Sequence, residues 1–277
     1  MGTFSLLLAF LAIPLFSTDS TRPSLRDWDR PIILDRSGGF QIGGRIISNA
    51  SQHTLSCDHG YMEYFIPWKP RRTSLVMCYT YEPTFLDQAN FVNWKFGPRY
   101  PNWYPGGQFP THDLHAWQQA TSARYFEFDN YANIVLQARA ASIAADSGKV
   151  ADSIVYLTNS AGGLRAQLTA VLSNTTNIKA IVAYESFGFV FPDNINITAD
   201  TQGGFGPVVS RLSAELINLY EGNAEVLMLA LDASIKGNTH IPFADLGNRK
   251  TAALLEKVLK SAGLDGYARG RWRDWQP

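Results

Sequence analysis

Asp152-Ser-Ile-Val-Tyr-Leu-Thr-Asn-Ser160-Ala-Gly-Gly163, with the run Leu164 to Leu172 behind it, is the stretch that decides the fold prediction. Ser153 to Leu157 is a short apolar run typical of a buried strand, and the following run has helical spacing. A serine on the tight turn between a strand and a helix has the context of a nucleophile elbow. Small neighbours suit such a turn, because its backbone is strained and packs against the helix. The pattern predicts a nucleophilic Ser160, although Thr158 stands where the motif usually has its first glycine.

Strand-like and helix-like patterns alternate around this turn. Helical patterns cover His112 to Arg124, Asn130 to Asp146 and Thr251 to Ala262. Apolar runs at Ile178 to Tyr184 and Val226 to Leu231 are typical of buried strands. Alternating buried strands and helices predict an α/β fold with a parallel sheet.

The N-terminal part of the chain has other patterns. Arg22 to Arg36 is rich in proline and charge and predicts an extended arm, and the glycine-containing stretch Gly38 to Ile47 predicts a hairpin. His59 to Pro67 alternates like a strand, and Thr73 to Met77 is a short apolar run suited to a buried strand. Tyr79 to Pro110 is dense in aromatic residues and has no clear periodicity. Such a segment is either a functional wall or lid over a pocket, or a loop packed by its own aromatics.

Composition limits the class of protein. With 277 residues and 45% hydrophobic content, the chain is able to bury the core of one α/β domain, placed here at residues 37–266. Residues 267–277 form a basic, aromatic tail that is expected to be loose. The 24 basic side chains balance 24 acidic ones without a basic stripe, which excludes nucleic acid as an expected partner.

The first residues predict secretion. The apolar run Phe4 to Phe16 is too short to span a bilayer and has the length of a secretory signal core. Polar Ser17 to Ser20 follows, so we expect a signal peptide over residues 1–18 and an extracellular, secreted protein; a buried N-terminal strand is the alternative. No later segment of the sequence predicts a membrane span.

Glycosylation and cysteine patterns fit that compartment. Sequons begin at Asn49, Asn174 and Asn196. Cys57 and Cys78 are the two cysteines of the chain, and an even pair in an oxidising compartment is expected to form a disulfide.

A serine nucleophile needs a base, and histidine suits because its unperturbed pKa is about 6.5. Of the five histidines, His240 alone lies after a late predicted strand, in the polar loop Lys236 to Pro242. A carboxylate must then orient the imidazole. Glu185 and Asp232 each end an apolar run, where open α/β sheets place their sites, so position alone leaves both open.

Three motifs carry a resemblance: Thr158 to Gly163, Tyr184 to Ser186, and Gly237 to Asp245. With these motifs the chain resembles secreted microbial α/β-hydrolases, many of them fungal, which are related to bacterial esterases with a glutamate as triad acid. The resemblance implies a Ser160-His240-Glu185 triad, which selects Glu185 over Asp232, and implies neither metal nor cofactor. The matching stretches are Gly39 to Gly44, Leu55 to Pro67, Asn90 to Pro110, Asp152 to Tyr184 and Asn223 to Asp245.

The sequence departs from that family at the oxyanion hole. One donor is expected from the backbone N–H of Ala161, and the other normally follows the third strand, here after Met77. The chain continues to Tyr81 without a His-Gly pair or a glycine cluster. The resemblance implies tens of residues absent between Met77 and Glu82, and a second gap near Val209 to Ser213. We therefore expect an α/β-hydrolase-like, mostly parallel sheet flanked by helices but lacking one or two strand/helix units.

The leading functional hypothesis is a secreted serine esterase that acts on a small-molecule ester. The alternative is a catalytically impaired, hydrolase-like secreted binding protein, and a third is a carbohydrate binder using Trp94, Trp103 and Tyr104. His112 and His115 have the spacing of metal ligands on a helix but are better explained as a solvated helix face, so no metal site is predicted. The sequence predicts no oligomeric state.

Overall fold

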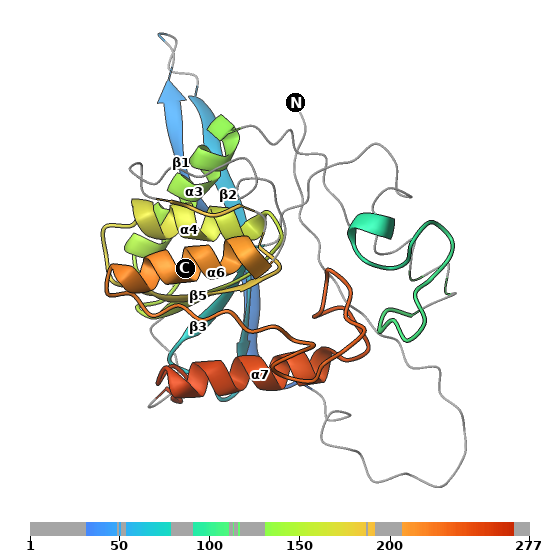
Figure 1. The fold of residues 1–277 in the computed structure, drawn as a ribbon. Helices are drawn as coiled ribbons and strands as arrows, with labels where there is room; N and C mark the ends of the chain where they lie inside the picture. The colour runs from blue at the N-terminus through green and yellow to red at the C-terminus, as the bar shows by residue number, and fades with distance from the viewer. Residues whose placement is uncertain are drawn as a thin grey trace, which may run out of the picture.

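A computed structural model of the chain describes residues 32–48, 50, 54–78, 91–110, 113, 116, 131–186, 188–191 and 207–268. Within these residues lie a two-stranded sheet and a separate three-stranded sheet. Figure 1 shows most helices of the described part beside these sheets, while the short teal helix near residue 91 lies apart from them. None of those helices combines the length and the hydropathy that a bilayer crossing requires.

The three-stranded sheet is parallel and has the order β3-β4-β5. Its strands are β3 at Ser74–Cys78, β4 at Ile154–Asn159 and β5 at Ile178–Tyr184. β4 lies in the centre, and most of its residues are buried, as its apolar sequence requires. The strands predicted from these three apolar runs are confirmed, and so is the parallel α/β arrangement.

Two helices cover one face of this sheet. α4, Gly162–Leu172, connects β4 to β5, and α3, Tyr131–Asp146, packs against α4. The helix predicted over Asn130 to Asp146 is confirmed. The core between these elements contains mainly small residues from the helices and larger ones from the sheet: Ala144, Ala145, Val150, Ala151, Ile154, Tyr156 and Ala166.

The two-stranded sheet is one long antiparallel hairpin, formed by β1 at Leu34–Ser48 and β2 at Thr54–Pro67. Figure 1 shows the end of β1 and the beginning of β2 projecting beyond the rest of the described chain. The prediction of a hairpin inside Gly38 to Ile47 is therefore wrong. The glycines are ladder positions rather than turns, and a Cβ on Gly38 would lie 2.7 Å from Oη of Tyr64, which crosses the strand there.

Two further helices lie in the C-terminal part: α6 at Pro207–Leu219 and α7 at Asn248–Ser261. α7, which confirms the predicted terminal helix, lies at the opposite end of the described chain from the end of β1 (Figure 1). α6 occupies the region of the second expected gap. Residues 220–247 contain no strand, so the strand predicted at Val226 to Leu231 is wrong. No described strand pairs with this stretch, and its second half forms a turn, as in the bond from Leu231 N–H to Met228 O at 3.0 Å.

The end of the described chain returns to the start of the sheet. Tyr267 forms an isolated antiparallel bridge with Arg71, whose guanidinium lies 5.3 Å from the centre of the tyrosine ring. The N–H of Ala268 donates to the carbonyl of Pro70 at 3.0 Å. The first two residues of the predicted loose tail are thus attached, and residues 269–277 lie outside the described part.

Other predictions fall partly or wholly outside the described residues. These are the signal peptide at residues 1–18, the sequons at Asn49 and Asn196, most of the helix predicted at His112 to Arg124, and the side chains of Cys57 and Cys78. The predicted disulfide therefore stays a prediction. Asn174 is described and lies exposed in the loop between α4 and β5.

Candidate active site

Ser160 occupies a strained turn between β4 and α4. Its φ is 54°, a left-handed value that costs a residue other than glycine about 1–3 kcal/mol. Its carbonyl accepts a 3.0 Å hydrogen bond from Gly163 N–H, and its own N–H donates to the carbonyl of Tyr184 at 3.1 Å. The side chain lies on a partly exposed turn at the carboxyl edge of the sheet, which is the expected geometry of a nucleophile elbow.

Gly163 explains why small residues follow the serine. A Cβ at this position would lie 1.9 Å from the Oγ of Ser186, far inside van der Waals contact. The glycine therefore lets α4 approach the segment that directly follows Glu185. The third small residue after Ser160 thus couples the elbow to the segment that carries the expected acid.

The structure brings Glu185 and His240 together. Oε2 of Glu185 lies 2.7 Å from Nδ1 of His240. The His240 side chain is only 4% exposed, whereas that of Glu185, which follows β5 directly, is 33% exposed. In the neutral imidazole, Nδ1–H donates to the carboxylate, so Nε2 keeps the lone pair that accepts a proton. This pairing leaves His240 in the tautomer that a general base requires.

The surroundings of Glu185 favour its ionised form. Burial raises the pKa of this carboxyl, but hydrogen bonds from His240 and Lys95, together with the Lys95 charge, hold the pKa below its ordinary value. The carboxylate is therefore negative at neutral pH and able to stabilise an imidazolium.

Asn159 connects three segments of the site. Its Nδ2 donates 3.1 Å and 2.8 Å hydrogen bonds to the carbonyls of Tyr184 and His240. The side chain is almost fully buried, and its two amide hydrogens account for the two bonds. The residue before the elbow serine therefore holds both the end of β5 and the loop that carries the histidine.

A buried carboxylate shapes the loop around His240. Asp245 is 1% exposed and accepts hydrogen bonds at 2.8 Å from both the N–H and the Oγ1 hydroxyl of Thr239. The Thr239 hydroxyl in turn accepts from Ile241 N–H at 3.1 Å. The residues on both sides of His240 are thus fixed by one hydrogen-bonded unit.

The aromatic segment packs beneath this loop. Its buried cluster consists of Phe91, Trp94, Phe96, Phe109 and, from the histidine loop, Ile241. His240 N–H donates to the carbonyl of Trp94 at 2.9 Å. Of the two interpretations of the segment, the structure favours a loop packed by its own aromatics.

That packing bears on the expected carbohydrate platform. Trp94 is 5% exposed, and Trp103 is stacked on Phe109 with ring centroids 5.9 Å apart. Tyr104 is the one member of the expected trio that is well exposed. The trio does not form an open sugar-stacking surface.

The first oxyanion donor has a suitable place. Ala161 directly follows Ser160 and caps the N-terminus of α4, where backbone N–H groups and the helix dipole favour negative charge. The second donor is expected just after β3. Cys78, the last residue of β3, pairs with Thr158, so the chain leaves β3 beside the elbow. Tyr79 and the residues up to position 90 lie outside the described part.

Asp232, the competing candidate for the acid, is engaged elsewhere. Its Oδ2 accepts a 2.7 Å hydrogen bond from Met228 N–H, and its own N–H donates to the Met228 carbonyl at 2.8 Å. It therefore stabilises a turn of its own, and the geometry favours Glu185.

Three residues of the site were not identified from the sequence: Lys95, the bridging Asn159 and Asp245. Asn159 lies within the serine motif, and Asp245 ends the histidine motif, so their places in these motifs were the available signals. Lys95 lies in the aromatic segment without any pattern that separates it from other lysines.

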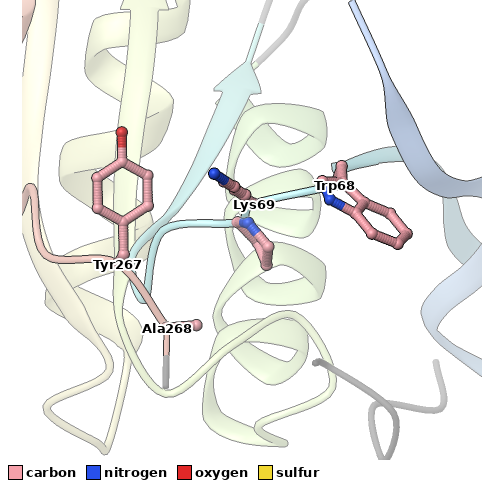
Figure 2. A pocket seen from close by; sticks show the side chains of 5 residues that line it. Trp68, Lys69, Tyr267 and Ala268 are labelled. Atoms are coloured by element: carbon pink, nitrogen blue, oxygen red, sulfur yellow. The ribbon is translucent and has the colours of Figure 1, made fainter. Parts of the chain in front are cut away.

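Features that could hold another ligand are few in the described part. No three side chains of histidine, cysteine, aspartate or glutamate there come together as metal ligands. A pocket of about 200 Å³ is lined by Trp68, Lys69, Pro70, Tyr267 and Ala268 (Figure 2). Half or more of the Trp68 and Tyr267 surfaces is exposed. The pocket precedes β3, whereas Ser160 and Glu185 follow the other ends of their strands, so it is separate from the candidate site.

Comparison with known proteins gives a fold but no family. No family model matches the sequence, and no curated protein matches it. A solved structure described as that of a novel bacterial esterase is similar, with a TM-score of 0.68 and 18% sequence identity. The match covers 87% of this chain and 99% of the esterase chain. The chain therefore has an esterase-like α/β fold.

Proposed function

We propose that this protein is a serine carboxylic-ester hydrolase, with Ser160 as nucleophile, His240 as general base and Glu185 as the carboxylate that orients His240. The observation that carries the proposal is the 2.7 Å contact between His240 Nδ1 and Glu185 Oε2. It is supported by the strained turn at Ser160, by the Asn159 bridge and by the esterase-like fold.

In the first half of the reaction, Ser160 Oγ attacks the ester carbonyl carbon while Nε2 of His240 accepts the hydroxyl proton. The carbonyl π electrons move to oxygen, and the N–H of Ala161 stabilises the resulting oxyanion. Collapse of this intermediate breaks the ester C–O bond. His240 returns the proton to the leaving alkoxide, which departs as the alcohol.

In the second half, water attacks the acyl-serine and gives its proton to His240. The second tetrahedral intermediate collapses, the bond between the acyl carbon and Ser160 Oγ breaks, and His240 protonates that oxygen. A carboxylic acid is released and the enzyme is restored. Glu185 stays ionised throughout and stabilises the imidazolium.

The proposal includes the setting predicted from the sequence. The protein is secreted after removal of residues 1–18, is glycosylated at Asn49, Asn174 and Asn196, and carries a Cys57–Cys78 disulfide. Its substrate is a small-molecule ester, and the steps above use only groups of this chain and water.

The direct test is Ser160→Ala assayed on short-chain p-nitrophenyl esters. We expect kcat/KM to fall at least about a thousandfold, because the covalent route is lost. Ser261→Ala is the matched control, since Ser261 hydrogen-bonds only to its own helix at Val258 O (2.9 Å) among the contacts described. Equal turnover by wild type and Ser160→Ala would disprove the nucleophile assignment.

A catalytically impaired, hydrolase-like binding protein is the second candidate. The observation in its favour is the small parallel sheet, in which β3 exposes about half of Leu75 and Met77 within the described part. A fluorophosphonate probe separates the two proposals. Labelling of the wild type that is lost in Ser160→Ala supports the enzyme; a wild type that is neither labelled nor active supports the binding protein.

A further inference from the structure

Lys95 contacts the side of Glu185 that His240 does not use. Its Nζ lies 2.5 Å from Oε1 of Glu185, while Oε2 of the same carboxylate meets His240. The glutamate therefore lies between two nitrogen groups. A carboxylate with both oxygens bonded cannot rotate without losing one partner, so the lysine contact fixes the orientation of the contact with His240.

The backbone at Lys95 is held in an unusual conformation. Five described residues other than glycine have a left-handed φ, and three of them belong to this site: Lys95 at 62°, Ser160 at 54° and Glu185 at 44°. Such values cost about 1–3 kcal/mol each and persist only where the surroundings impose them. Strain concentrated in the two partners of an ion pair and in the nearby serine indicates a functional arrangement rather than a chance surface contact.

The neighbours of Lys95 provide that support. Trp94 and Phe96 are buried in the aromatic cluster, and the carbonyl of Trp94 accepts from His240 N–H. Lys95 N–H donates to Val92 O at 3.0 Å. The cluster therefore anchors the backbone on both sides of Lys95, while the side chain, 52% exposed, extends to the carboxylate.

We propose that Lys95 is a positioning residue of the site: its ammonium holds Oε1 of Glu185, directs Oε2 to His240, and offsets part of the carboxylate charge that acts on the imidazole. This role rests on the proposed function. It explains why the aromatic segment is tied to the histidine loop.

The charge effect has a definite sign. The described charged or titratable groups that act on Glu185 are Lys95 and His240, and its negative charge is also felt by Asp245. When Lys95 is replaced by a neutral residue, the uncompensated carboxylate favours an imidazolium more strongly. The neutral imidazole of His240, which is the form that acts as a base, then appears only at higher pH. The acidic limb of the pH–rate profile therefore shifts to higher pH.

The first test compares Lys95→Met with Lys95→Arg, which keeps the charge. The rate of fluorophosphonate labelling and kcat/KM are measured across pH. Because the pair is partly exposed, we expect the acidic limb of Lys95→Met to move up by about half a pH unit, whereas Lys95→Arg stays at the wild-type position. A limb that does not move, or moves equally in both variants, overturns the charge role.

The second test does not depend on activity. With ¹³C-labelled glutamate, the carboxyl titration of Glu185 is followed by NMR in wild type, Lys95→Met, Lys95→Gln and Lys95→Arg. We expect the pKa of Glu185 to rise in the two neutral variants and to stay low in Lys95→Arg. An unchanged pKa in both neutral variants overturns the proposal. A wild type without esterase activity but with the expected titration refutes the proposed function and retains the Lys95–Glu185 coupling.

Discussion

The candidate site joins two halves of different construction. Ser160 and Glu185 each follow a strand of the parallel sheet, and their backbones are connected by the bond from Ser160 N–H to Tyr184 O. His240 and Lys95 come from segments without strands, held by the Asp245 unit and by the aromatic cluster. The proposed nucleophile and acid are therefore placed by sheet register, and the proposed base is placed by side-chain hydrogen bonds and packing.

The two halves are expected to lose their structure in different ways. A strand ladder distributes its strength over many backbone bonds, whereas the His240 loop depends on a few groups such as Asp245 and Asn159. Local opening is therefore expected to begin in the loop half, and hydrogen exchange there should be faster than in β4 and β5.

The largest effect is expected from Gly163→Val in the sheet half. The new side chain overlaps Ser186, whose Oγ would be 1.9 Å from the added Cβ. We expect a loss of about 3 kcal/mol in unfolding free energy and displacement of Glu185, because overpacking forces backbone shifts. Urea unfolding and probe labelling measure the two effects. Gly163→Ala with Ser186→Gly, which removes the opposing side chain, should recover most of the loss relative to Gly163→Ala alone.

The next largest effect is expected from Asn159→Ala, which removes the side chain that connects the two halves by hydrogen bonds. The buried carbonyl of His240 loses its donor, and the carbonyl of Tyr184 keeps only the hydrogen bond from Ser160 N–H, so stability should fall by about 2 kcal/mol. Because the loop that carries His240 also loses its hydrogen bond to the residue before Ser160, His240 is no longer held in place. We therefore expect kcat/KM to fall about a hundredfold. Asn223→Ala, at an exposed position outside the sequons, is the control. Unchanged activity in a stable Asn159→Ala variant would show that the sheet alone positions the base.

A smaller effect is expected from Asp245→Ala, in the loop half. The two donors of Thr239 lose their acceptor, at a cost of about 1 kcal/mol or more. Asp245→Asn is the matched control, since its amide oxygen accepts one bond and its NH₂ is able to donate to the Thr239 hydroxyl. Faster hydrogen exchange in residues 236–247, with β4 unchanged, is the expected signature. Equal acceleration in both halves would contradict their separation.

The smallest effect concerns pH. The folded pKa of Glu185 is lowered, so its contribution to stability is present above the ordinary value of 4.5 and is lost as pH falls through the lowered pKa. Burial raises the pKa of Asp245 more than the two Thr239 hydrogen bonds lower it, and the charge of Glu185 adds a smaller upward shift. Its stabilising contribution is therefore present below 3.8 and is lost as pH rises through the raised pKa.

Unfolding free energies measured in urea from about pH 3 to about pH 7 test these signs. Glu185→Gln should remove a loss that occurs on acidification, and Asp245→Asn should remove a loss that occurs as pH rises. Variants that change the pH slope in the same direction would contradict the assignment of opposite shifts to the two halves.

The sheet half was predictable because its signals are local. The apolar runs of β4 and β5, the small residues after Ser160 and the helix pattern of α4 each lie within a few residues of the feature that they specify. The choice of Glu185 over Asp232 came from a family resemblance. The geometry agrees with it, since Glu185 meets His240 while Asp232 caps a turn.

The features that the sequence did not predict correctly are determined by contacts with residues far away in the chain. The run Val226 to Leu231 has the composition of a strand, but no strand of the described part pairs with it, and its second half forms a turn. The glycines of β1 were mistaken for a turn because the space that they leave is filled by Tyr64 of the other strand. Lys95 could not be identified because its partner, Glu185, lies 90 positions away.

The pairing of β3 with β4 has a consequence for the order of folding. β4, α4 and β5 are consecutive, so their contacts close short loops, whereas β3 reaches β4 only after the long stretch between Cys78 and Ile154 is closed. Local units form faster than distant pairings. The β4–α4–β5 unit is therefore expected to fold first, with Ser160 and Glu185 already at adjacent strand ends. The segments bearing Lys95 and His240 then close over them, and the candidate site is completed last.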